Sequence, residues 1–146
     1  MLFRSDAAGG RLGVWRQTWP MVRDFWPDGV GIGAFAQAMV RYHQGSYLFY
    51  VNHAHNEYLQ LLAEGGALAM AGAAAAMLAA ARLIARRLAS DRTPLFWVRA
   101  GAAAGLAAVA VQCLWETPLS LPANAVLLAL LAAVATHDAD ERSARA

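Results

Sequence analysis

The sequence predicts an all-α membrane protein, in which a helical loop region on the outer side of the membrane precedes three transmembrane helices. The chain of 146 residues is 59% hydrophobic and only 15% charged, whereas soluble domains carry about 25% charged residues. Alanine and leucine dominate its second half, in apolar runs close to the roughly 20 residues that a helix needs to cross a bilayer. The first half is mixed, with tryptophan, arginine and histidine among its apolar residues.

Charge and cysteine content argue against binding to nucleic acid and against an internal disulfide. The net charge is only +2, and every basic residue is an arginine. The arginines are spread along the chain, so no compact basic patch predicts binding to nucleic acid. Cys113 is the single cysteine, which rules out an internal disulfide. Residues 1–10 lack the apolar core of a signal peptide, and we expect them to be a disordered or cut end of a longer protein.

Residues 11–61 are expected to form a loop region with short helices. Trp15, Trp19, Val22 and Trp26 recur at the spacing of one helix face. Pro20 should break or kink that helix. Two interpretations stay open for this stripe, because tryptophan and arginine suit a membrane interface and also suit a helix packed on the rest of the protein. A turn is predicted at residues 26–29, which read Trp-Pro-Asp-Gly.

The next segment holds a glycine pattern that resembles a dinucleotide fingerprint. Gly31, Gly33 and Ala36 fit G-x-G-x-x-A. A turn precedes the pattern where a strand is required, and no acidic residue follows at about twenty positions. We therefore predict a tight bend or a close approach of two backbones. Residues 37–51 are expected to form a loop.

Three apolar stretches follow the loop region. They are predicted as transmembrane helices at residues 62–85, 95–115 and 119–136, and residues 137–146 form a charged tail. Arginines cluster around the connector between the first two helices, whereas the turn at residues 116–122 has no basic residue. By the positive-inside rule, the connector and the tail are cytoplasmic. Gly101 and Gly105 make a G-x-x-x-G that permits close helix packing.

The polar residues at 52–58 are the strongest candidates for chemistry. His53 and His55 form an H-x-H, but no further ligands appear at a common spacing, so no metal site is predicted. One histidine is a candidate general base, and the upstream arginines are candidates for binding a phosphate or diphosphate. The alternative is structural, because Asn56 or Asn52 is also suited to cap the following helix.

Three motifs in order along the chain resemble the O-antigen ligase and polymerase family of bacterial membrane proteins. The segment from His53 to Gly66 is similar to the family's His-Asn pair followed by a helix ending in Glu-x-Gly. Upstream, Gly10-Arg11-Leu-Gly-Val-Trp15 and Gly29-Val-Gly-Ile-Gly-Ala-Phe35 resemble its Gly-Arg, Trp and Gly-x-Gly-x-Phe run. The turn at residues 116–122 resembles its closing hairpin. The similarity covers residues 10–75 well and 110–135 weakly.

This resemblance implies a partial GT-C-like glycosyltransferase fold in the bacterial inner membrane, with the histidines on the periplasmic side. Its members move a glycan from undecaprenyl diphosphate to lipid A-core or a growing glycan, without a metal or other cofactor. The resemblance makes His55 the candidate base and Arg11 the candidate diphosphate clamp. The candidate substrate-binding residues are Arg16, Arg23, Asn56 and Tyr58. Because most of the expected spans are absent, we expect this chain to be inactive alone.

Two other functions remain open. A fragment of a transporter or flippase would line a path with polar residues, yet the predicted spans hold almost none. A non-catalytic membrane module of a polysaccharide-export complex would need neither His55 nor Arg11.

Overall fold

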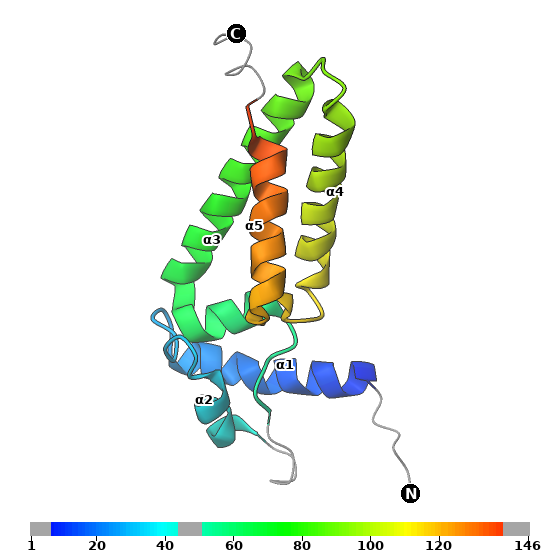
Figure 1. Ribbon diagram of the computed structural model, residues 1–146. Helices are drawn as coiled ribbons and strands as arrows, with labels where there is room; N and C mark the ends of the chain where they lie inside the picture. Colours follow the sequence, from blue (N-terminus) through cyan, green and yellow to red (C-terminus); the bar gives the residue numbers. More distant parts are fainter. Residues whose placement is uncertain (1–6, 44–50, 139–146) are drawn as a thin grey trace, which may run out of the picture. The chain divides into compact units, whose positions relative to one another are not determined.

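The computed structural model describes residues 7–43 and 51–138, and every regular element in those residues is helical. This agrees with the predicted all-α class. The elements in chain order are α1 (Ala7–Asp24), α2 (Phe35–Tyr42), α3 (Glu57–Ser90), α4 (Phe96–Gln112), the short 3-10 helix η1 (Pro118–Ser120) and α5 (Pro122–Thr136) (Figure 1).

The chain divides into two compact units. The first consists of residues 1–73 and 112–117, and the second consists of residues 74–111 and 118–146. Helix α3 therefore begins in the first unit and ends in the second. All the candidate catalytic and substrate-binding residues fall in the first unit. This unit also contains the segment that follows α4.

The first unit has a small apolar core between α1, α2 and the start of α3. Its buried members are Met21, Val22, Phe35, Met39, Ala54 and Ala63. Trp15 donates its indole Nε1–H to the carbonyl oxygen of Ala54 at 2.8 Å, whereas Trp19 and Trp26 of the same predicted stripe are exposed. Trp15 is thus hydrogen-bonded within this unit, whereas the other two tryptophans of the stripe keep about half or more of their surface exposed.

Three local expectations in the first unit differ from the structure in part, and the first is the predicted break or kink at Pro20. Pro20 does not end α1, which continues to Asp24. The lost hydrogen bond is outweighed because Thr18, Met21 and Val22 on both sides of the proline are buried. The expected loop at residues 37–51 begins as helix α2, and residues 44–50 lie outside the described part. The helix also begins at Ala7, within the stretch expected to be a disordered or cut end.

The predicted turn and the close backbone approach are both confirmed. Gly29, Gly31 and Gly33 have positive φ angles, a conformation that favours glycine. A Cβ on Gly29 would lie 2.6 Å from the backbone nitrogen of Gly66. The backbone N–H groups of Val30 and Gly31 donate to the carbonyl oxygens of Ala63 and Glu64, both at 2.9 Å.

The same approach interrupts α3 at Gly66, where φ is 64° and ψ is −162°. The loop carbonyl of Pro27 accepts a hydrogen bond from the backbone of Ala67 at 2.7 Å. Glu64 completes the joint, because its Oε1 accepts from the backbone N–H of Phe35, the first residue of α2, at 3.3 Å. The Glu-Gly-Gly sequence at 64–66 therefore joins the loop, α2 and α3.

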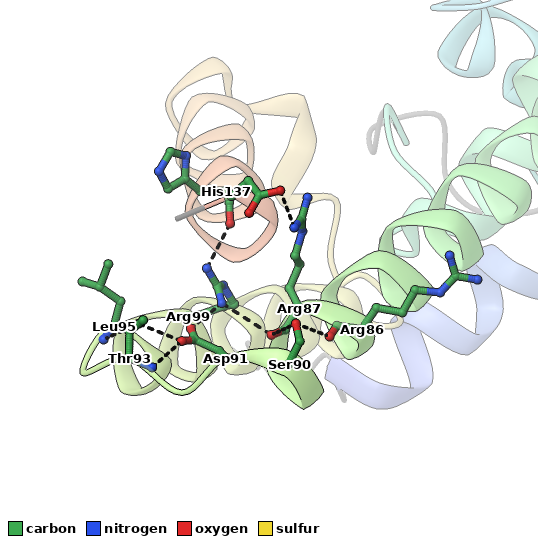
Figure 2. Close-up of polar contacts among 9 residues, drawn as sticks. Arg86, Arg87, Ser90, Asp91, Thr93, Leu95, Arg99 and His137 are labelled. Carbon is green, nitrogen blue, oxygen red and sulfur yellow. Dashed lines mark hydrogen bonds and ion pairs between the residues drawn. The ribbon is translucent and has the colours of Figure 1, made fainter. Parts of the chain in front are cut away.

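The second unit contains the later part of α3 together with α4, η1 and α5. The predicted close packing holds at Gly105, where an added Cβ would lie 3.2 Å from Leu131 of α5, whereas nothing lies within 4 Å of such an atom at Gly101. Buried Arg99 organises one end of the unit (Figure 2). It forms an ion pair with Asp91 and donates to the carbonyl oxygen of His137 at 2.9 Å.

One helix in the described part, α3, is long and apolar enough to cross a membrane, and α4 and α5 are apolar but shorter. The apolar 18-residue window of α3 has no buried residues, unlike the central helix of a soluble core. Large apolar side chains also project outward from the second unit, including Trp97, which is 78% exposed. These features are compatible with a membrane protein.

Candidate functional site

The segment that carries His55 is fixed by hydrogen bonds on both sides. Ala54 is fully buried, its carbonyl accepts from Trp15, and its backbone N–H donates to Gln60 Oε1 at 2.9 Å. His55 itself has a φ of 51°. A residue other than glycine seldom adopts this left-handed conformation, which persists only where the surrounding structure enforces it.

Asn56 begins α3 by capping it. Its Oδ1 accepts a hydrogen bond from the backbone N–H of Leu59 at 2.9 Å, which satisfies one of the free N–H groups of the first turn. The predicted capping role of Asn56 is confirmed. The next backbone N–H, that of Glu57, donates to the carbonyl oxygen of Cys113 at 2.8 Å. This bond ties the start of α3 to the segment that follows α4.

Glu116, in that segment, brings the two candidate catalytic residues together. Its Oε1 forms an ion pair with Nη2 of Arg11, and its Oε2 lies 3.5 Å from Nδ1 of His55. Arg11 comes from α1, His55 from the residue before the cap of α3, and Glu116 from the turn after α4. One carboxylate thus faces a cation with one oxygen and an imidazole with the other.

The imidazole of His55 presents its two nitrogens to different surroundings. Nδ1 is buried and makes no hydrogen bond within the described residues, although Glu116 lies near it. The side chain as a whole is 45% exposed, so the ring remains reachable from outside. A buried polar atom without a partner is costly, and the nearby carboxylate is the group that is positioned to satisfy it.

A pocket of about 630 Å³ lies in the same unit, and Arg11, His55 and Glu116 are not among its lining residues. Leu12 and Asn56, which directly follow Arg11 and His55 in the sequence, do line it, as does Leu114, two residues before Glu116. The remaining lining residues are mostly apolar or aromatic: Trp15, Arg16, Trp19, Tyr58, Leu59, Leu62 and Met70. The pocket therefore offers an apolar wall with an arginine, a phenol and an amide on it.

The structure brings three of the four predicted substrate-binding residues to this pocket. Arg16, Asn56 and Tyr58 line it, whereas Arg23 does not. Arg23 belongs to the last turn of α1, and the helical rise puts its Cα about 18 Å from that of Arg11. Arg16 is exposed at the pocket and makes no ion pair within residues 7–43 and 51–138.

Two further polar residues near His55 have structural contacts. His53 Nδ1 lies 3.3 Å from Nε2 of Gln60, and that amide also donates to Glu64. Glu64 in turn accepts a hydrogen bond from the backbone N–H of Phe35 in α2. In the described residues, no three His, Cys, Asp or Glu side chains are grouped as metal ligands would be.

Sequence reasoning missed Glu116 as a site residue. The turn at residues 116–122 stands out in the sequence for its lack of basic residues and for its resemblance to a closing hairpin, and neither feature marks Glu116. The sequence nevertheless contained a signal for Glu116. By the positive-inside rule, this turn is predicted to lie on the same side of the membrane as Arg11 and His55. A lone carboxylate there is a natural partner for either residue.

Comparison with known proteins identifies a family for the part of the chain that contains Arg11 and His55. A family model described as O-Antigen ligase matches residues 3–74. A search of curated proteins and a search of solved structures each found no match. Members of the matched family are proteins of the bacterial inner membrane that act in glycan ligation. Over residues 3–74, just under half of its length, the chain is therefore similar to the O-antigen ligase family.

Proposed function

We propose that the protein containing this chain transfers a glycan from undecaprenyl diphosphate to an acceptor hydroxyl on lipid A-core or a growing glycan, at the periplasmic face. The observation that carries the proposal is the bridge made by Glu116 between Arg11 and His55. A cation for a diphosphate and a base for a hydroxyl are the two groups that this reaction requires, and they lie on either side of one carboxylate.

The reaction assigns a separate task to each residue. The acceptor oxygen attacks the anomeric carbon of the donor, and the bond from that carbon to the diphosphate oxygen breaks. The proton of the acceptor hydroxyl passes to His55, because an imidazole accepts protons near neutral pH. The electron pair of the broken bond leaves with the diphosphate, whose charge Arg11 stabilises through its guanidinium N–H groups.

The pocket in the first unit suits an isoprenoid diphosphate. Its aromatic and aliphatic residues offer an apolar surface to the first isoprene units. Arg16 lines the pocket and offers a phosphate oxygen a positive charge besides that of Arg11. Asn56 spends its Oδ1 on the helix cap, so its amide N–H groups are the part assigned to the substrate. Tyr58 contributes an aromatic wall with a polar tip.

The membrane arrangement in this proposal has three spans and a GT-C-like fold. Residues 67–90 of α3 alone measure about 36 Å as a helix, which exceeds a hydrocarbon core of about 30 Å. Helices α4 and α5 complete the spans, and the Arg-rich connector faces the cytoplasm. The contact of Glu116 with Arg11 supports this orientation, since it requires residue 116 and the N-terminal unit to share one side.

A test compares two histidines that lie two positions apart. The complete gene product is expressed in cells whose own ligase gene has been deleted, and surface glycan linked to lipid A-core or extended in length is measured. His55→Ala should lower transfer by roughly 10²–10⁴-fold, the usual contribution of general acid–base catalysis. His53→Ala serves as the matched control, because His53 contacts the amide of Gln60, and it should retain most of the transfer.

Equal transfer by His55→Ala and the unmodified protein, at equal membrane abundance, would overturn the assignment of the base. Loss of glycan at the cell surface with intact ligation in isolated membranes would favour the transporter alternative. Loss of complex assembly with either histidine variant would favour an export module.

A further inference from the structure

We infer that Glu116 is a positioning residue that responds to the donor, pairing with Arg11 when no diphosphate is bound and with His55 when a diphosphate occupies the arginine. This inference rests on the proposed transfer reaction. It assigns a role to a residue that lies outside the family match at residues 3–74.

The first observation is that the two carboxylate oxygens of Glu116 face different partners. Oε1 is engaged in the ion pair with Arg11, while Oε2 stops 3.5 Å from Nδ1 of His55. A hydrogen bond between nitrogen and oxygen usually measures 2.7–3.2 Å. The carboxylate is therefore paired with the arginine. Its other oxygen is a few tenths of an ångström too far from Nδ1 of His55 for an ordinary hydrogen bond.

The second observation is the state of the imidazole that faces it. Nδ1 of His55 is buried and makes no hydrogen bond in the part of the chain that the structure describes. Its backbone is held at a φ of 51° by the fixed segments on both sides. An unsatisfied buried nitrogen and a strained backbone both carry a free-energy cost, and movement of Glu116 toward the ring removes the first of them.

The backbone around Glu116 is anchored, so the exchange needs only its side chain. The N–H of Glu116 donates to the carbonyl of Gln112 at 3.0 Å, and Cys113 accepts from the backbone of Glu57 at 2.8 Å. A carboxylate carried on two methylene groups pivots between neighbours at this distance. The side chain of Glu116 is 41% exposed, so it is not enclosed by packed neighbours.

The pivot couples donor binding to activation of the base. A diphosphate carries more negative charge than a carboxylate and takes over the guanidinium of Arg11. The released Glu116 then accepts a hydrogen bond from Nδ1–H of His55, which fixes the tautomer with a free lone pair on Nε2. A carboxylate in that position also stabilises the imidazolium formed when Nε2 takes the acceptor proton.

This arrangement predicts opposite effects of Glu116→Gln on binding and on turnover. The variant removes the negative charge that competes for Arg11, so farnesyl diphosphate should bind about 3–10-fold more tightly. The same variant removes the carboxylate from His55, so kcat for glycan transfer should fall roughly 10²-fold. A residue with only a structural role would weaken both.

The binding experiment uses the full gene product in lipid nanodiscs and titrates farnesyl diphosphate calorimetrically. Asp28→Asn is the matched control, because it removes one exposed carboxylate from the same unit without touching Arg11 or His55. It should leave affinity and kcat within about twofold. Glu116→Asp keeps the charge on a shorter stem, and it should restore part of the lost kcat. Weaker or unchanged binding of farnesyl diphosphate to Glu116→Gln would overturn the inference.

Nitrogen-15 NMR of labelled histidine, compared with His55→Ala to assign the signal, separates this inference from the proposed function. At pH 8, saturating farnesyl diphosphate should shift His55 toward the Nδ1–H tautomer in the unmodified protein but not in Glu116→Gln. That shift without any glycan transfer would uphold the pivot and contradict the transferase. Transfer with no tautomer shift would overturn the pivot and leave the transferase intact.

Discussion

In the His55-Asn56 dipeptide, the structural role of Asn56 is compatible with the role that we propose for His55. The amide of Asn56 caps α3 through Leu59, as a helix-start sequence predicts. The cap fixes the first turn of the helix, and the residue before it is left with a φ of 51°. The same local geometry that starts the helix therefore directs the imidazole of His55 toward Glu116.

Gly66 provides a sharp test of the joint between the loop and α3. Gly66→Ala should destabilise the protein by about 3 kcal/mol or more, because its backbone conformation is almost restricted to glycine. The added Cβ would also lie 2.6 Å from the backbone carbon of Asp28. The measurement is the midpoint of thermal unfolding in detergent micelles.

Gly72→Ala is the matched control for Gly66→Ala, with the same added methyl six positions along the helix. Nothing lies within 4 Å of its Cβ position, so the exchange should stabilise the helix by about 0.5–1 kcal/mol. Similar unfolding midpoints for the two variants would show that the loop and α3 do not approach each other as described.

Among the elements, the connector between α3 and α4 has the clearest polar organisation (Figure 2). Oδ1 of Asp91 accepts hydrogen bonds from the hydroxyl and the backbone N–H of Thr93 at 2.7 and 2.8 Å, and Oδ2 pairs with Arg99. Arg99 reaches from α4 to the residue after α5. The connector thus joins the ends of all three helices of the second unit.

The contribution of this connector to the stability of the folded protein should fall in acid. The hydrogen bonds from Thr93, assisted by Arg99, lower the pKa of Asp91. A lowered pKa in the folded state means that Asp91 contributes stability above its unfolded pKa of about 3.9, and that this contribution is lost as the pH falls through the folded pKa. The unmodified protein should be more stable than Asp91→Asn at pH 6, and the difference should shrink below about pH 4.

The difference in unfolding midpoint between the two proteins in detergent, measured from pH 6 to pH 3, isolates Asp91 because other carboxylates titrate in both. A difference that stays constant over this range would show that Asp91 does not gain its stability as a carboxylate.

For the complete protein, the decisive property is its orientation in the membrane. The connector with its arginines should be cytoplasmic, and the unit with His55 should be periplasmic. In a Cys113→Ala background, a membrane-impermeant maleimide should label Asn52→Cys in intact spheroplasts. It should label Arg92→Cys only after permeabilisation. Both native side chains are exposed, and labelling in the reverse pattern would contradict the orientation.

Local sequence features accounted for much of what the structure contains. The helical class, the turn after Trp26, the glycine approach and the Asn56 cap all depend on a few neighbouring residues or on strong residue preferences. The helix at residues 37–42 escaped prediction, and the sequence did not decide between a break and a kink at Pro20. This helix and the continuation of α1 through Pro20 depend on burial against the core of the first unit, through Met39 and through Met21 and Val22, which overrides local preference.

Composition and spacing pointed to a histidine at 53 or 55 and to the upstream arginines, and the resemblance to the O-antigen ligase family narrowed these to His55 and Arg11. Glu116, which contacts both residues, could not be predicted as a site residue in this way. Glu116 follows Arg11 by 105 positions, and no local pattern marks it as a site residue. Only the return of the chain to the first unit after α4, through the bond between Glu57 and Cys113, decides that this carboxylate meets that arginine and that imidazole.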